Sequence, residues 1–71
     1  MGHLLIHCKP EYLPEVKRLG LDYIQMPDGE VDIKVVDEGF TAEDSIYGDP
    51  DIDLCEHYGI DYDQVNHIEE I

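Results

Sequence analysis

The stretch LDYIQMPDGEVDIKVVD, residues 21–37, carries the strongest fold signal in the sequence. Its centre, Met26-Pro27-Asp28-Gly29, favours a tight turn, because proline presets the first turn dihedral, aspartate suits the next position and glycine accepts a positive φ. Apolar runs flank this turn on both sides, over residues 21–26 and 31–37. The sequence therefore predicts a β-hairpin made of these two runs.

The second run of the hairpin has the alternation of a half-buried strand. Val31, Ile33 and Val35 occupy every second position and are expected to face the core. Asp32 and Lys34 lie between them and are expected on the outer face of the sheet.

The residues before the hairpin predict one strand and one helix. The apolar run at residues 4–8 reads as a first strand. Pro10 and Pro14 then place the start of a helix that runs to about Arg18, since proline suits a first helical turn and not a helix interior. Gly20 lies where a left-handed C-terminal cap is expected.

Beyond Gly39 the sequence predicts three short helical segments, over residues 41–48, 50–58 and 61–70. The first and third begin with the spacing of a capping box, and the second begins with Asp49-Pro50, a cap followed by proline at the first helical position. The second is expected to stop at Gly59.

The fold class predicted from these elements is α+β, in the order β-α-β-β-α-α-α. A three-stranded sheet contains the hairpin, one helix follows the first strand, and short helices form the C-terminal part. The length of 71 residues suits one core, so residues 1–71 are expected to form a single small acidic domain.

Charge is distributed very unevenly along the chain, whose formal net charge is -14. Residues 1–27 carry three basic and three acidic side chains, whereas residues 28–71 carry fifteen acids and the single Lys34. One side of the folded protein is therefore expected to present a strong anionic field.

Residues 50–70 resemble a helix-turn-helix motif in spacing. Cys55 is the small residue of the first helix, Gly59 is the turn glycine, and Val65 and Ile68 supply the apolar face of the second helix. Lysine and arginine are absent from the would-be recognition helix, where carboxylates prevail. Because DNA binding depends on cations that neutralise phosphates, we expect no direct nucleic-acid binding.

The acids instead predict a surface that imitates nucleic acid and occupies the basic nucleic-acid-binding surface of a target protein or complex. Carboxylates on helices and strands lie several ångströms apart, a spacing comparable to that of phosphates along a strand. Tyrosines beside carboxylates can anchor such an interface by contacting arginine. The expected partner-binding residues are Asp28, Glu30, Asp32, Asp49, Asp53, Glu56, Asp61, Tyr62, Asp63 and Glu70.

In size and charge the chain resembles small phage-encoded inhibitors, such as anti-CRISPR, anti-restriction and DNA-glycosylase-inhibitor proteins. That resemblance implies action by occupying a DNA- or RNA-binding channel, and it assigns no residues. The alternative reading is a small adaptor domain that does not imitate nucleic acid and binds a partner through its helical hairpin.

Metal sites and catalysis are not predicted. The acids that follow Gly48 begin like a calcium loop, but Leu54 stands where such a loop needs glycine and Ile60 where it needs glutamate. The histidines and cysteines lack paired zinc-ligand spacing, and Cys55 and His57 diverge on a helix. We therefore expect a non-enzyme without cofactor or metal.

The location expected from the sequence is the cytoplasm, that of the host cell if the protein is phage-encoded. The apolar run near the N-terminus is too short for a membrane span and has no basic flank. Cys8 and Cys55 make at most one bridge, far fewer than small secreted domains use.

Overall fold

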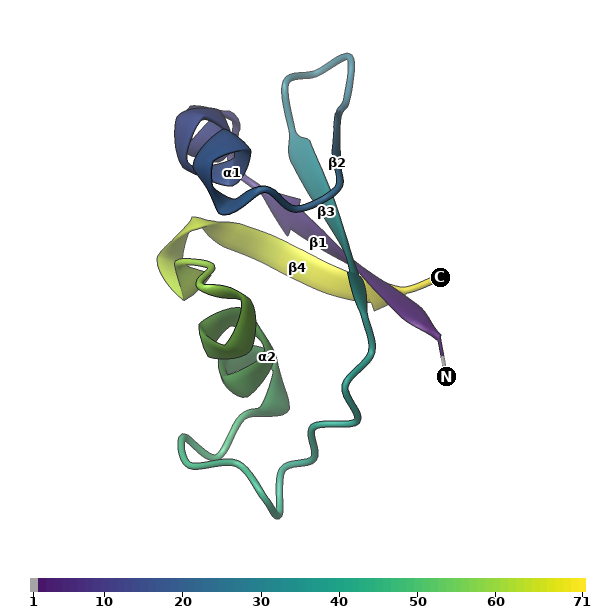
Figure 1. The fold of residues 1–71 in the computed structure, drawn as a ribbon, viewed down its shortest axis with the longest axis vertical. Coiled ribbons are helices and arrows are strands. Elements are labelled where there is room, and N and C mark those ends of the chain that lie inside the picture. Colours follow the sequence, from purple (N-terminus) through teal and green to yellow (C-terminus); the bar gives the residue numbers. More distant parts are fainter. Residues whose placement is uncertain (1) are drawn as a thin grey trace.

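The computed structural model describes residues 2–71, which form a four-stranded sheet and two α-helices (Figure 1). The elements, in chain order, are β1 (His3–Cys8), a 3-10 turn (Pro10–Tyr12), α1 (Leu13–Leu19), β2 (Tyr23–Gln25), β3 (Val31–Val36), α2 (Pro50–Tyr58), a second 3-10 turn (Tyr62–Gln64) and β4 (Val65–Glu70). The α+β class is therefore confirmed, with one strand more and fewer helices than predicted.

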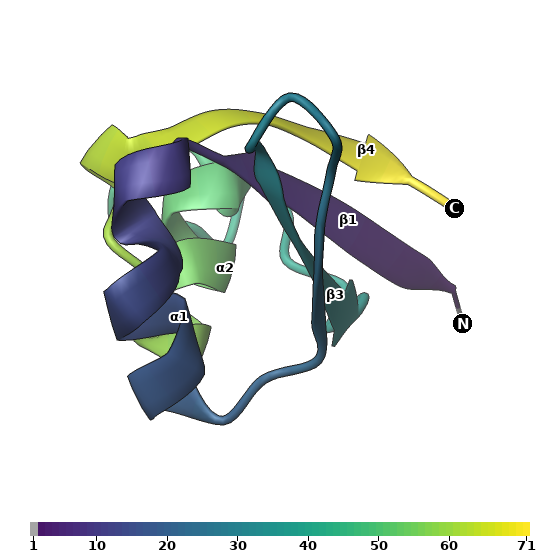
Figure 2. The ribbon, with the colours of Figure 1, turned by 90° about the horizontal axis from the view of Figure 1, so that it is seen from above.

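The sheet is antiparallel throughout and has the strand order β2-β3-β1-β4. The two central strands pair so that Ile6 lies opposite Ile33 and His7 opposite Asp32. Both helices lie against the same face of this sheet (Figure 2). The predicted hairpin is confirmed as β2 and β3, and its turn is closed by the Met26 N–H, which donates to the Glu30 carbonyl at 2.7 Å.

The predicted last helix is wrong, because residues 65–70 form strand β4. The Asp61 side chain does cap the Asp63 N–H, yet it starts only a single 3-10 turn. The chain then pairs with β1, with Ile68 opposite Ile6. Without β4, β1 would be an edge strand with unpaired backbone groups, and this pairing outweighs the local helix signal.

An irregularity in β4 explains why the sequence suggested a helix. The register between β1 and β4 shifts between His7 and Cys8, so that His67 lies opposite His7 while Val65 lies opposite Cys8. The extra residue, Asn66, makes a β-bulge. It lets Val65 and Ile68, three residues apart, both pack against the core, which is the spacing that also fits one face of a helix.

The predicted segment at residues 41–48 is likewise not a helix. The capping contacts form, since the Thr41 hydroxyl donates to Asp44 at 3.1 Å and the Asp44 N–H donates back at 3.4 Å. They close an isolated turn within the loop of residues 37–49. A turn this short gains too little from hydrogen bonds to propagate a helix without packing.

Helix α2 begins and ends where predicted. The Asp49 side chain accepts a hydrogen bond from the Asp51 N–H at 3.0 Å, Pro50 takes the first helical position, and Gly59 adopts a φ of 76° at the C-terminal end. Helix α1 ends at its predicted cap, Gly20, which has a φ of 71°. Left-handed backbone of this kind is readily adopted by glycine.

The core fills the space between the sheet and the two helices. It comprises Ile6, Cys8, Tyr12, Val16, Val31, Ile33, Val35, Leu54, Cys55 and Ile60. Both cysteines are free thiols at 0% exposure. Across residues 2–71, no helix has the length and apolar character needed to cross a membrane.

Candidate functional site

A group of polar side chains lies on the sheet face turned away from the helices. His7 in β1 points away from its buried neighbours, because side chains alternate along a strand. The pairing of β1 places Asp32 of β3 on one side of His7 and His67 of β4 on the other. Together with Glu30 and Glu69, these three residues form what we call the histidine–carboxylate cluster.

Both ring nitrogens of His7 face carboxylates. Its Nδ1 lies 2.7 Å from Glu30 Oε1 and 2.9 Å from Asp32 Oδ1, and its Nε2 lies 2.7 Å from Glu69 Oε1. The His67 ring stacks on the His7 ring, with centroids 3.9 Å apart and planes inclined by 12°. The imidazole is thus fixed in position by contacts on both edges and one face.

Electrostatics in the cluster favour a charged His7 ring. Burial on its own would lower the pKa of His7, but the hydrogen bonds to Glu30 and Glu69 and the negative charge of Asp32 outweigh it and raise the pKa. The hydrogen bond with His7 lowers the pKa of Glu30. Burial, followed by the nearby Glu30 carboxyl, raises the pKa of Asp32. The single imidazole ring of His7 therefore contacts three carboxyl groups.

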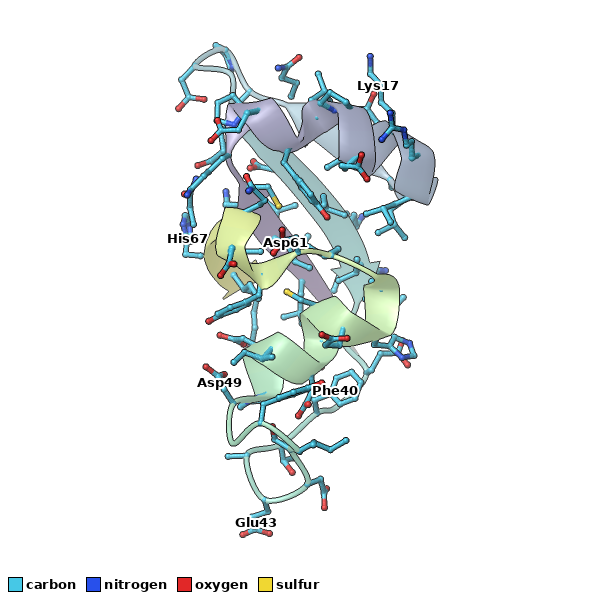
Figure 3. All side chains as sticks on the ribbon, turned by 90° about the vertical axis from the view of Figure 1, so that its left-hand side faces the viewer. Lys17, Phe40, Glu43, Asp49, Asp61 and His67 are labelled. Atoms are coloured by element: carbon cyan, nitrogen blue, oxygen red, sulfur yellow. The ribbon has the colours of Figure 1, made fainter. Side chains whose placement is uncertain are left out.

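The second feature is the acidic end, which we define as residues 37–58, the loop before α2 and α2 itself. This segment contains eight acidic residues and neither lysine nor arginine. Glu43 and Asp49 lie toward one end of the molecule, and Lys17 lies at the other (Figure 3). The longest dimension is 36 Å, several Debye lengths at physiological salt, so Lys17 at one extremity does little to screen the loop around Glu43 at the other.

The acidic end also holds an apolar hollow of about 330 Å³ between the loop and α2. Ile46 and Tyr47, which are 89% and 54% exposed, line it with Phe40. The Phe40 ring meets His57 of α2 edge-on, with ring centroids 5.6 Å apart. The acidic side chains around the hollow are Asp44, Asp53 and Glu56, and His57 also lines it.

The structure places the predicted partner-binding residues in several separate regions of the molecule. Asp53 and Glu56 line the apolar hollow, and Asp49 caps α2 beside it. Glu70 borders a smaller hollow of about 150 Å³ together with Asp51 of α2. Asp61, Tyr62 and Asp63 are exposed in and around the second 3-10 turn, and Asp28 lies in the hairpin turn, where it accepts the Glu30 N–H at 2.9 Å.

Two sequence expectations need correction here. Asp32 does lie on the outer face of the sheet, but it is only 3% exposed, because His7 and the neighbouring strands enclose it. It is therefore not available to a partner surface. The helical hairpin that would resemble a helix-turn-helix does not exist, because its second helix is β4.

Sequence reasoning missed the cluster itself, apart from two of its acids. His67 and Glu69 were placed on a helix, where residues two apart diverge. In a strand the same spacing brings both side chains to one face, the face of His7. The alternation through Asp32 and His7 was readable in the sequence, but which strands pair was not.

Comparison of the chain with protein-family models, with curated proteins and with solved structures gives no match. Function is therefore inferred from the side chains and their surroundings.

Proposed function

We propose that this protein is an acidic inhibitor that binds the basic nucleic-acid-binding surface of a target protein, with its carboxylates in the places of phosphates. The observation that carries the proposal is the acidic end: eight carboxylates, with neither lysine nor arginine, in one continuous segment that lies toward one end of the folded molecule. A surface of this kind attracts a basic partner over long range and repels nucleic acid.

The apolar hollow supports a contact more specific than charge alone. Arginine carries a planar guanidinium on an aliphatic stem, so it can stack on an aromatic ring while it pairs with a carboxylate. Tyr47 and Phe40 offer exposed rings, and Asp53 and Glu56 lie beside them. A nucleic-acid-binding surface rich in arginine would find both kinds of contact at this end.

A second candidate function is a protein-binding adaptor that does not imitate nucleic acid. The exposure of Ile46, at 89%, favours it, since exposed apolar patches ringed by polar residues mark protein interaction sites. The partner would then be held mainly by the apolar hollow. Its binding would change little with salt, and nucleic acid would not compete.

The experiment is a comparison of two charge-reversed proteins that carry the same net charge. The test protein has Asp44→Lys, Asp53→Lys and Glu56→Lys around the hollow. The control has Glu11→Lys, Glu15→Lys and Asp22→Lys in the N-terminal part, which has no net charge. Partners are captured by crosslinking from nuclease-treated lysate of the native host, identified, purified, and titrated with each protein.

We expect the test protein to lose binding to an identified nucleic-acid-binding partner, by about 100-fold or more if the three carboxylates contact it. The control should keep most of its affinity. Equal loss in both proteins would mean that total charge and not this surface is responsible. Full binding by the test protein would contradict the proposal.

A further inference from the structure

The contacts of His7 leave one buried carboxylate oxygen without a hydrogen bond. His7 Nδ1 can carry a single hydrogen, and two acceptors compete for it, from Glu30 at 2.7 Å and Asp32 at 2.9 Å. Hydrogen-bond geometry is met toward Glu30. Among residues 2–71, Asp32 Oδ1 therefore has no hydrogen-bond partner, although the Asp32 side chain is only 4% exposed.

A buried carboxylate oxygen without a partner is unfavourable and needs a physical reason. Among residues 2–71, no lysine or arginine forms an ion pair with the cluster, whose polar members are histidines, carboxylates and Asn66. Two carboxyl groups, those of Glu30 and Asp32, instead approach the same nitrogen atom. A cation among these three atoms would satisfy all of them.

We propose that His7 Nδ1, Glu30 and Asp32 form a binding site for one divalent transition-metal ion such as Zn²⁺. Imidazole nitrogen and carboxylate oxygen are ligands that such ions accept readily. The two carboxylates match the charge of the ion, and Asp32 Oδ1 gains the partner that it lacks. The site goes beyond the proposed inhibitor function and does not depend on it.

Distances in the cluster suit this assignment. Within the described residues, the ligand atoms of His7, Glu30 and Asp32 all lie within 4.8 Å of one another. Two ligands that each lie about 2.0–2.2 Å from one ion are separated by about 3.3–3.6 Å in the tetrahedral geometry usual for zinc. The observed 2.7 and 2.9 Å from Nδ1 to the two oxygens are shorter than that separation, so the ligand atoms must move apart by less than about 1 Å to admit the ion.

The surroundings hold the three ligands in place. His7 Nε2 faces Glu69 Oε1 at 2.7 Å, so a hydrogen on that nitrogen leaves Nδ1 free to bind the ion. The Asn66 amide donates to the second oxygen of Glu30 at 3.4 Å. Stacking on His67 restrains the ring further. The Glu30 side chain is 25% exposed, and it gives the ion a route from solvent.

A rival ligand set uses the opposite edge of the same ring. His7, His67 and Glu69 also bring their ligand atoms within 4.8 Å of one another. We favour the Glu30 and Asp32 set because it alone explains the unpartnered Asp32 oxygen. Glu69, by contrast, is well exposed and already hydrogen-bonded to Nε2.

The test titrates Zn²⁺ into protein stripped with EDTA, by calorimetry, in buffered physiological salt with excess Ca²⁺ to occupy the acidic surface. The ligand variants are Asp32→Asn and Glu30→Gln, each nearly identical in shape to the native residue. Glu70→Gln and Asp63→Asn are matched controls that each remove an exposed carboxylate outside the cluster. Circular dichroism checks that each variant is folded. If Asp32→Asn does not fold, the proposal is tested with Glu30→Gln alone.

We expect one Zn²⁺ per chain, and a loss of affinity of at least about 10-fold in both ligand variants, the lower end of the loss seen even when a residue only orients a ligand. The controls should bind as the native protein does. Nitrogen-15 NMR of the imidazoles should show the ion on Nδ1 of His7.

Absence of Zn²⁺ binding to the native protein under these conditions would overturn the proposal. So would unchanged affinity in the ligand variants. Zinc on Nε2 of His7, with affinity lost in Glu69→Gln or His67→Asn and kept in Glu30→Gln, would overturn the assigned ligand set in favour of the rival one.

Discussion

In the histidine–carboxylate cluster three carboxylates surround one buried imidazole, whereas in the acidic end eight carboxylates have one exposed histidine near them. His7 is 8% exposed and contacts Glu30, Asp32 and Glu69. His57 is half exposed, and its closest carboxylate, Glu38, lies 3.9 Å away. Carboxylates therefore contact a buried histidine in one region and are mostly exposed to solvent in the other.

This difference shows that net charge alone does not locate a binding surface. Carboxylates fixed around a neighbouring histidine have little left to offer a partner protein, because their negative charge is directed at the imidazole. Exposed carboxylates stay charged and accessible to other molecules, and they repel one another within the protein. The acidic end therefore carries the proposed binding function, and the cluster carries the proposed ion.

The largest expected effect comes from removing the shared imidazole. We expect His7→Ala to lower the free energy of unfolding by about 3 kcal/mol, because it leaves carboxyl groups facing one another without a partner in a partly buried site. His57→Ala in the acidic end should change it by less than about 0.5 kcal/mol. Urea unfolding of both variants without metal measures the difference, and equal effects would remove the distinction between the regions.

The anchoring of α2 can be tested through the thiol under the acidic end. Cys55 lies on the inner side of α2 at 0% exposure, and burial raises its pKa to about 12. In a Cys8→Ser background we expect Cys55 to react with a thiol reagent at pH 8 roughly 100-fold or more slowly than in the unfolded chain, since the thiolate is the reactive form. Rapid reaction in the folded protein would show that α2 and its hollow are not held in place.

Neutralising one carboxylate in each region should change stability in opposite directions. Glu30→Gln is expected to cost about 1–2 kcal/mol without metal, because the amide oxygen of glutamine is a neutral and weaker acceptor for the His7 ring N–H. Glu56→Gln should stabilise the protein slightly at low salt, since it removes a negative charge near the C-terminal end of α2. Thermal unfolding at two salt concentrations measures both effects, and the gain in Glu56→Gln should vanish at high salt.

A loss of stability in Glu56→Gln, with or without salt, would contradict this assignment. It would mean that Glu56 already has a stabilising partner within the protein, as Glu30 does.

Local signals in the sequence were enough to predict much of the fold. The turn at Pro27-Asp28-Gly29, the cap and proline at Asp49-Pro50 and the glycine at the end of each helix act within a few residues of one another. The hairpin and the helices α1 and α2 that they predicted are confirmed, whereas the capping boxes at Thr41 and Asp61 formed only short turns. Strand β4 could not be predicted in this way, because its bulge puts Val65 and Ile68 on one face at a spacing that a helix also produces.

The two candidate sites also differ in how far the sequence predicts them. The acidic end lies within residues 28–71, whose excess of acidic residues is visible from composition alone. The cluster joins three strands, and its members are up to 62 positions apart in the sequence. Asp32 was assigned to the outer face, but its burial follows from the strand pairing that puts His7 opposite it.

The most direct test of the central claim is competition between this protein and nucleic acid for one identified partner, measured by fluorescence anisotropy over a range of salt concentrations. We predict that the protein displaces a labelled oligonucleotide completely, and that its affinity falls steeply as salt rises, as expected for a surface of exposed charges. A complex with protein and oligonucleotide bound together, with an affinity that does not change with salt, would contradict imitation of nucleic acid.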